Sequence, residues 1–404
     1  MKKAILILAI LSLAFFLFSK QEQHEVTVRN IEVPVRVFDG DQFVDNLTIE
    51  DFEIYENGIP QKIEALYLGN KNQITRQQEL KKFAPRTKRN YYLLFQIIDY
   101  NPKLEKSIEY FFTNVLLPQD TLTLMTPQKN YYLSSEALSK KKKEDIAKEM
   151  LKILKKDTKT GSAAYRSQMR SLKGLVSSIS GGDMMGDPDA DPDFAGGSSS
   201  LGMLLRRYRN NLEKMEGLRM VDQELFLQFA KQVKAIEGQK HVYLFYEREF
   251  RPELSTQVSS NLVSEYHDQP NIMGDLQDLF QFYQRHDRIN TQKISQAFAD
   301  ASICFNLLFV DREERNSGGI TMREQSEDLY KAFTETAKAT GGFVDTSRNP
   351  SAGFHNALDA TENYYLLYYS PANYTADGSY KTIQVRLKDK NYKVSHRQGY
   401  YATN

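Results

Sequence analysis

The sequence has no tryptophan and only one cysteine, Cys304, among its 404 residues. A single cysteine cannot form a disulfide within the chain, so packing and hydrogen bonds must hold the fold together. Cys304 lies in the apolar segment 302–310 (SICFNLLFV), where we expect a small buried hydrophobic group rather than a nucleophile. Its aromatic side chains are 24 tyrosines and 23 phenylalanines, which we expect to pack mainly in the core and on sheet faces.

The chain also lacks an excess of charge of either sign. Lysine and arginine number 53 and aspartate and glutamate 52, which gives a net charge of +1. Removal of the first nineteen residues would take away Lys2 and Lys3 and leave a net charge of −1. A balanced charge provides no general attraction for nucleic acid or for anionic lipid, so we expect no nucleic-acid partner.

Motifs of the common enzyme classes are absent from the sequence. It contains no His-Glu-x-x-His zinc motif, no Gly-x-Ser-x-Gly turn, no phosphate-binding loop and no dinucleotide fingerprint. We therefore expect no catalytic residues, no cofactor and no enzymatic activity. The alternative is a hydrolase whose site is assembled from dispersed residues, and it would require a polar cleft with perturbed carboxylates.

The N-terminus has the pattern of an export signal. Lys2 and Lys3 precede an apolar run over residues 4–18, which is short for a membrane span. Ser19 is an acceptable small residue before a cleavage site, but Leu17 occupies a position where a small residue is preferred. We expect residues 1–19 to be a signal peptide, with a retained signal-anchor as the alternative. The protein is then exported to the periplasm, the cell envelope or the medium, and it contacts a membrane only if this segment is retained.

Strand patterns mark both ends of the chain. Apolar and polar residues largely alternate between residues 26 and 37, and Asn57-Gly58 is a hairpin signal. Strand-like segments return after residue 363. Because neither end has enough strands to cover an apolar face, we expect residues 24–68 and 363–404 to pack into one β-sandwich-like domain. The polar residues 69–90 predict a linker.

The middle of the chain alternates strands and helices. Residues 91–99 (YYLLFQIID) form a near-continuous apolar run, as expected for a buried parallel strand, and further strands are predicted near residues 121–125, 241–246 and 303–310. This alternation predicts an α/β domain over residues 91–350, with a doubly wound and mostly parallel sheet.

A helical insertion is predicted over residues 137–216 within the α/β domain. Its glycine-, serine- and aspartate-rich part, residues 181–200, is predicted to be a mobile acidic loop. The run DPDADPD lacks the glycine and glutamate that a calcium loop needs at its sixth and twelfth positions, where Pro192 and Ser198 stand. The lysines at 140–143 are followed by acidic residues, which favours a solvated helical face over a site for an acidic partner.

Two segments resemble the exported bacterial proteins described as related to the von Willebrand factor type A (VWA) domain. The first comprises residues 33–39 (VPVRVFD) and 46–58 (NLTIEDFEIYENG), which are similar to the family's pattern of strand, Asp-Phe stretch and Glu-x-Gly turn. The second is 236–245 (IEGQKHVYLF), where a helix ends at a Gly-x-Lys sequence and a buried strand follows.

A third resemblance lies in the C-terminal part. The Thr-Gly-Gly sequence 340–342 is followed by 364–371 (YYLLYYSP) and by the ending 394–401 (VSHRQGYY). The order and spacing of the three segments, rather than any one motif, resemble the family over most of residues 26–402. The resemblance implies a VWA-like doubly wound sheet flanked by β segments, and it implies no reaction.

A VWA domain usually binds a magnesium or manganese ion after its first strand, through Asp-x-Ser-x-Ser and residues of other loops. This chain has Asp99, Asn101 and Lys103 at the corresponding positions. The amide oxygen of Asn101 is a possible ligand, but the ammonium of Lys103 has no lone pair to donate. It would also repel a nearby cation by about 4 kcal/mol per pair of unit charges at 4 Å. We therefore expect this metal site to be degenerate and no metal to bind.

Two interpretations of Lys103 remain open. Its ammonium would replace the cation and pair with Asp99, or it is a solvated residue in the first turn of a helix. The first interpretation leaves a partner site that is independent of metal. The sequence as a whole predicts a non-enzymatic, exported binding protein that acts in adhesion or scaffolding on a protein partner. An envelope-anchored structural protein is the alternative if the N-terminal segment is retained.

Overall fold

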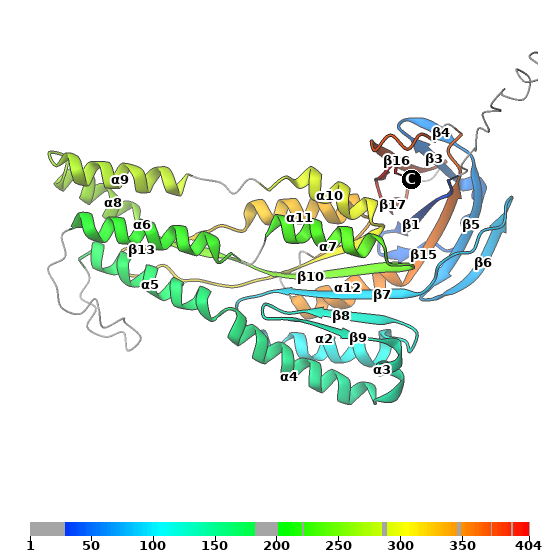
Figure 1. Cartoon of the computed structure of the whole chain (residues 1–404), viewed down its shortest axis with the longest axis horizontal. Coiled ribbons are helices and arrows are strands. Elements are labelled where there is room, and N and C mark those ends of the chain that lie inside the picture. The colour runs from blue at the N-terminus through cyan, green and yellow to red at the C-terminus, as the bar shows by residue number, and fades with distance from the viewer. Residues whose placement is uncertain are drawn as a thin grey trace, which may run out of the picture.

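A computed structural model describes residues 29–181, 201–219, 222–284, 289–345, 349–372, 374–388 and 391–403. The predicted signal at residues 1–19 and all but the first residue of the predicted acidic loop lie outside these ranges. Among the described residues, no helix is both long enough and apolar enough to span a membrane. The molecule has three parts, seen in Figure 1 as a helical lobe, a central α/β layer structure and a β domain.

The central sheet has six strands in the order β14-β12-β10-β7-β8-β9. All neighbours pair in parallel except the edge strand β9, which pairs antiparallel with β8. Numbered along the chain, the strands run 3-2-1-4-5-6 from one edge to the other, which is an order of doubly wound sheets. The prediction of an α/β chain with a largely parallel sheet is confirmed. The strands are β7 (Arg89–Gln96), β8 (Thr121–Met125), β9 (Asn130–Leu133), β10 (Gln239–Glu247), β12 (Ile303–Val310) and β14 (Val344–Asp345).

Helices cover both faces of this sheet. Successive residues of β7 point to opposite faces, and both faces are buried, which accounts for its continuous apolar sequence. On one face the ring of Phe245 stacks on Phe95 and meets Phe354 edge to face. On the other face the ring of Phe305 packs against Phe298 and Phe333. The first face carries α2 (Leu104–Tyr110), a π-helical turn (Phe111–Val115), α3 (Ser135–Lys140), α4 (Lys143–Gly161) and α12 (Pro350–Glu362). The second carries α7 (Gln223–Lys234), α10 (Thr291–Asp300) and α11 (Glu327–Ala339).

A helical lobe extends from the central layers, on the left in Figure 1. It has its own core, in which Tyr208 and Phe282 are fully buried. The lobe contains α5 (Ala163–Ile179), α6 (Leu201–Gly217), α8 (Thr256–Glu265), α9 (Pro270–Tyr283) and the two-stranded sheet of β11 (Phe250–Leu254) and β13 (Ile320–Glu324). It therefore draws segments from far beyond the insertion predicted at residues 137–216.

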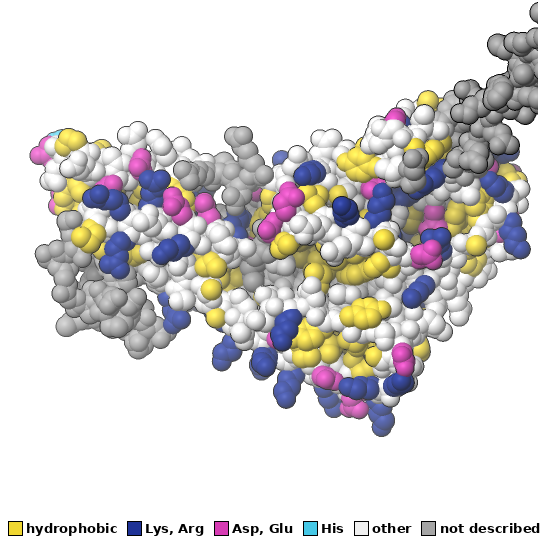
Figure 2. Space-filling model, viewed as in Figure 1, with side chains coloured by type: hydrophobic (Ala, Val, Ile, Leu, Met, Phe, Trp, Pro, Cys, Tyr) yellow, Lys and Arg dark blue, Asp and Glu magenta, His cyan; other side chains and the backbone are white. Residues whose placement is uncertain are grey.

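Helix α4 lies inside the predicted insertion but belongs to the central layers. Its buried residues Ile146, Met150 and Leu154 pack in the core of the sheet. Its opposite side carries lysines, and Figure 2 shows lysine and arginine side chains along this part of the surface. Near its start, Lys140 pairs with Glu136 and Lys141 with Glu149. The lysine run thus has acidic neighbours of its own.

The β domain is built from both chain ends. β1 pairs with β15 and β17, and β3 pairs with β16, so N-terminal and C-terminal strands are direct neighbours. The two sheets share one core, with Val33, Ile54 and Val385 among its members. One sheet has β17 (Lys393–His396), β1 (Ile31–Asp39), β15 (Asn363–Tyr369), β5 (Ile63–Asn70), β6 (Gln73–Glu79) and β2 (Gln42–Phe43); the other has β18 (Gly399–Tyr401), β16 (Tyr380–Leu387), β3 (Phe52–Glu56) and β4 (Ile59–Gln61).

Strand β6 corrects the predicted linker. Residues 69–90 were predicted to be a linker because they are polar, whereas Gln73–Glu79 pairs with β5 at the edge of the sheet. Exposed and half-buried side chains alternate along it. An edge strand with one face toward solvent needs few apolar residues, so its polar sequence concealed it.

Candidate functional site

The carboxyl-terminal edge of the central sheet is the first place to look for a binding site. The strand order reverses between β7 and β10, which lie side by side. In open α/β sheets, ligands generally bind outside the carboxyl ends of the strands at such a reversal. Three charged residues follow or end the strands here: Asp99 after β7, Glu247 at the end of β10 and Arg312 after β12.

Two guanidinium groups flank Asp99. Its carboxylate lies 3.6 Å from Nη1 of Arg166 and 3.6 Å from Nη2 of Arg312. The Asp99 side chain is 53% exposed, so this arrangement faces solvent. Positive charge therefore occupies the neighbourhood of the carboxylate that a metal ion would need, and it comes from side chains of the chain itself.

Arg166 is held in place by the end of β7. Its Nη1 donates to the carbonyl of Ile98 at 2.9 Å and to Oγ of Ser162 at 2.5 Å. Ser162 is fully buried between α4 and α5, and its hydroxyl also donates to the Ile98 carbonyl at 2.6 Å. The start of α5 is thus tied to the segment after β7 that carries Asp99, which fixes the guanidinium beside the carboxylate.

Glu247 holds the segment at Ile98 and Asp99 in place through backbone hydrogen bonds. Its Oε2 accepts hydrogen bonds from the backbone N–H groups of Ile98 at 2.5 Å and of Asp99 at 3.0 Å. The side chain is only 4% exposed. Burial raises the pKa of Glu247 to about 7, although the two N–H groups and the Arg312 guanidinium act in the opposite direction. Glu247 therefore positions the backbone at Asp99 and has little access to solvent.

A cavity of about 410 Å³ opens beside the two arginines. Four of its lining residues are basic and one is acidic. The acidic one, Glu314, accepts from Arg312 at 2.7 Å and from Lys173 at 3.0 Å. Even with Asp99 included, the cations outnumber the carboxylates. The lining residues are Tyr165, Arg166, Met169, Arg170, Lys173, Arg312 and Glu314.

The residues predicted from the degenerate metal motif lie at this edge, but they do not act together. Asn101 uses its amide oxygen to accept the backbone N–H of Lys103 at 3.0 Å, at the start of α2. Lys103 is exposed at the N-cap of that helix. The interpretation in which Lys103 pairs with Asp99 is wrong, because Arg166 and Arg312 are the ion-pair partners of that carboxylate. The side chain of Lys103 instead has the exposed position of the alternative interpretation.

This donor set does not fit the metal ion that the family resemblance would imply. Asp99 is flanked by two cations, the amide oxygen of Asn101 accepts the backbone N–H of Lys103, and Glu247 accepts two backbone N–H groups. Across the described ranges, no group of three or more His, Cys, Asp or Glu side chains is placed to hold a metal. A cation at Asp99 would meet repulsion of about 4 kcal/mol from each guanidinium at 4 Å.

Sequence reasoning found Asp99 but missed both of its partners. Arg166 lies on α5 and Arg312 follows β12, so each is remote from Asp99 along the chain. Neither belongs to a local motif, and only the folded arrangement brings them together.

No family model, no curated protein and no solved structure matches the chain. What this site binds must therefore be inferred from its own side chains.

Proposed function

We propose that the chain is a non-enzymatic, exported binding protein, active in adhesion or scaffolding. Its α/β part is a VWA-like domain that contacts a protein partner through the carboxyl-terminal edge of the central sheet, without a metal ion. The observation that carries this proposal is the pair of guanidinium groups, Arg166 and Arg312, on either side of Asp99. The 3-2-1-4-5-6 strand order supports the VWA-like assignment, and the motif resemblance adds to it.

The two arginines suit a partner that carries carboxylates. A metal ion in such a site would accept a carboxylate of the partner, and a guanidinium can do so with two parallel hydrogen bonds. Arg166 and Arg312 are 29% and 17% exposed, and the adjoining cavity is lined mainly by cations. The partner surface is therefore expected to be acidic, and its binding should weaken at high salt.

The hydrolase alternative has one observation in its favour, because the pKa of Glu247 is raised to about 7. Its geometry favours a supporting role instead. The carboxyl group is 4% exposed, and its Oε2 already accepts two backbone hydrogen bonds. A general acid or base must reach its substrate directly or through one water, and Glu247 has little access to either.

The proposal is tested by capture of partners from the native envelope with the full chain, with and without a metal chelator. We expect wild-type protein to retain a partner in both conditions. The double variant Arg166→Gln and Arg312→Gln should lose about tenfold or more of that affinity. Lys148→Gln is the matched control, since it removes an exposed positive charge from α4, away from the site.

Two outcomes contradict the proposal. One is capture that requires magnesium or manganese and is abolished by the chelator. The other is unchanged capture by the double variant, provided that its thermal unfolding shows an intact fold. A hydrolytic activity that depends on Glu247 would support the alternative instead.

A further inference from the structure

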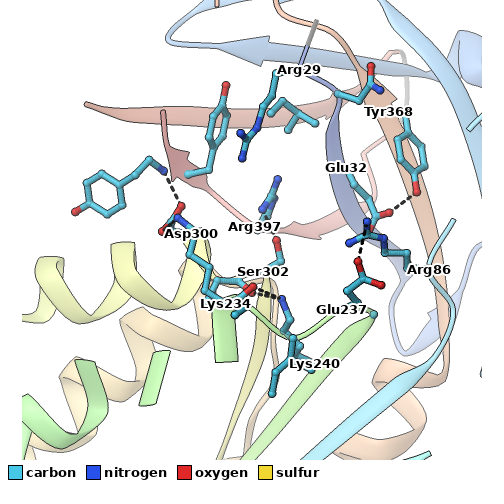
Figure 3. Close-up of a pocket in the computed structure, with 18 of the residues that line it drawn as sticks. Arg29, Glu32, Arg86, Lys234, Glu237, Lys240, Asp300, Ser302, Tyr368 and Arg397 are labelled. Atoms are coloured by element: carbon cyan, nitrogen blue, oxygen red, sulfur yellow. Dashed lines mark hydrogen bonds and ion pairs between the residues drawn. The ribbon is translucent and has the colours of Figure 1, made fainter. Parts of the chain in front are cut away.

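A second cavity lies at the amino-terminal ends of the central strands, opposite the arginine site. Here the central sheet meets the β domain (Figure 3). Its volume is about 560 Å³. Residues at the amino-terminal ends of β10 and β12 form one side, and residues of β1, β15 and the C-terminal strands form the other. Its walls thus come from both ends of the chain and from the α/β part, and it shares no lining residue with the arginine site.

Two of the cations around this cavity already have carboxylate partners. Arg86 pairs with Glu237 at 3.1 Å, and Lys234 pairs with Asp300 at 2.7 Å. Arg86 and Glu237 are both more than half exposed, so their pair lies at the rim. These charges are balanced without any ligand.

Lys240 and Arg397 differ from those two cations. Each is 7% exposed, and neither forms an ion pair with any carboxylate in the described part of the chain. The ammonium of Lys240 donates to the carbonyl of Ala301 at 2.8 Å. Arg397 donates through Nη1 to the hydroxyl of Ser302, while its buried Nε has no hydrogen-bond partner among the residues that the structure describes. Figure 3 shows both side chains between the β domain above and the sheet edge below.

Buried cations without a counter-charge are costly, and here they also face one another. Burial lowers the pKa of Lys240, and so do the nearby Arg397 and Arg86. Glu32 and Asp300 act in the opposite direction, and together these effects bring the pKa to about 8. Glu32 accepts the hydroxyl hydrogen of Tyr368. An anion between Lys240 and Arg397 would relieve their repulsion and satisfy donors that lack a carboxylate.

A third buried cation, Arg36, lies close to the cavity. It is 4% exposed, and its Nη1 donates to the carbonyl of Gly341 at 3.1 Å. Its buried Nε has no hydrogen-bond partner within the described ranges. A narrow space of about 30 Å³, lined by Arg36, Lys240 and Arg397 among others, adjoins the main cavity. Three buried cations therefore surround one region of the domain junction.

We propose that this cavity binds a small organic dianion, whose phosphate or paired carboxylate groups lie between Lys240 and Arg397. The two cations at the base of the cavity have no carboxylate partner, so a ligand with two negative charges would neutralise them. The volume falls within the range of small-molecule sites and exceeds what an oxyanion alone would occupy. The remainder of the ligand is expected to lie against the aromatic side chains of the wall, which include Tyr368, Tyr400 and Tyr401.

The experiment measures heat of binding to the full chain at constant ionic strength, with inorganic phosphate, phenyl phosphate and phthalate as probes. At least one of the two aromatic dianions should bind more tightly than inorganic phosphate, because the wall contacts its ring. Preference for phenyl phosphate would identify a phosphate ester as the ligand class, and preference for phthalate a dicarboxylate.

Lys240→Met should weaken binding by about tenfold or more, equivalent to about 1.4 kcal/mol. The control Lys148→Gln removes one positive charge from the exposed side of α4 and should leave binding unchanged. Wild-type affinity should also fall as the pH rises above about 8, where Lys240 loses its proton. This pH dependence tests Lys240 even if the variant fails to fold.

Absence of binding by all three probes at millimolar concentration would overturn the proposal. So would equal affinity in wild type and Lys240→Met. Because the cavity and the arginine site occupy opposite edges of the sheet, such a result leaves the proposed partner site untouched.

Discussion

At the scale of single residues, charge placement decides what the carboxyl-terminal edge can bind. Arg166 and Arg312 each lie 3.6 Å from the carboxylate of Asp99. A metal ion bound at Asp99 would therefore either displace these two guanidinium groups or be repelled by them. Arginine does not lose its proton in the accessible pH range, so this effect persists at every working pH.

The first prediction at this scale concerns metal. Millimolar magnesium or manganese should leave the midpoint of thermal unfolding unchanged, both in wild type and in Asp99→Ala. A metal at a hundred times its dissociation constant would stabilise the fold by about 2.7 kcal/mol. A rise of several degrees in wild type that disappears in Asp99→Ala would therefore show that the site binds metal.

The second prediction concerns Glu247, whose pKa is raised to about 7 from a usual value of 4.5. A raised pKa means that the folded state holds the proton more tightly than the unfolded state does. Its contribution to stability is complete below about pH 4.5 and is lost as the pH rises through about 7. Relative to Glu247→Gln, the free energy of unfolding of wild type should fall by roughly 3 kcal/mol across this interval.

Denaturant titrations at a series of pH values measure this difference. Glutamine can keep the hydrogen bonds from Ile98 and Asp99, because its amide oxygen is also an acceptor. Glu144→Gln, on the exposed first turn of α4, should follow the wild-type curve and serves as the control. Parallel curves for wild type and Glu247→Gln would mean that the carboxyl group titrates normally.

At the scale of elements, the Thr-Gly-Gly sequence at residues 340–342 has a steric explanation. Gly341 has a φ of +71°, and a Cβ there would lie 2.9 Å from the backbone of His396 in β17. At Gly342 a Cβ would lie 1.8 Å from the carbonyl oxygen of Phe305 in β12. The two glycines let α11 end close to the sheet and to the C-terminal strands.

Gly342→Ala should accordingly lower the free energy of unfolding by about 2–4 kcal/mol, because backbone atoms rather than a flexible side chain must move. Gly274→Ala is the matched control. It lies within α9 with open space around it, and should stabilise the fold by about 0.5–1 kcal/mol. Chemical denaturation of both variants measures the difference. Equal effects would show that the close approach to Phe305 relaxes at little cost.

At the scale of the whole molecule, the two chain ends depend on each other. β15 lies between β1 and β5 in one sheet, and β16 pairs with β3 in the other. Further contacts join the β domain to the central layers, including the backbone hydrogen bond from Gln398 to Ala339 at 2.8 Å. The cavity that we propose as an anion site exists only because these parts meet.

Deletion of residues 363–404 should therefore unfold the N-terminal strands as well, since β1 and β5 would lose the strand between them. Hydrogen exchange should show loss of protection for amides in Ile31–Asp39 and Ile63–Asn70. Protected amides in these strands after the deletion would mean that the N-terminal strands fold independently.

The α/β part should fold alone only if α12 is kept. Phe354, Ala357 and Leu358 of this helix are buried in the core of the sheet. A fragment of residues 88–362 satisfies this requirement, whereas one that ends at residue 350, the predicted domain boundary, exposes that core. No helix was predicted there, because the apolar residues of α12 form a weak pattern.

The sequence by itself determined the features that depend on local pattern. Continuous apolar strands such as Arg89–Gln96 can only be buried on both faces, and their alternation with helices requires a covered parallel sheet. Asn57-Gly58 specified a tight turn, and both residues have positive φ between β3 and β4. Asp99 follows a recognisable strand, and the family resemblance singled it out as a metal-site position.

Only the tertiary structure determined which distant residues lie next to those features. The guanidinium groups beside Asp99 come from α5 and from the loop after β12, and Lys240 and Arg397 come from different domains. Likewise, neither the edge strand β6 nor the set of segments that forms the helical lobe could be recognised from the sequence. Contacts between residues remote in the chain leave no periodicity in the sequence, because they are set by how whole elements pack. The charges at both edges of the sheet could therefore be recognised as sites only in the folded molecule.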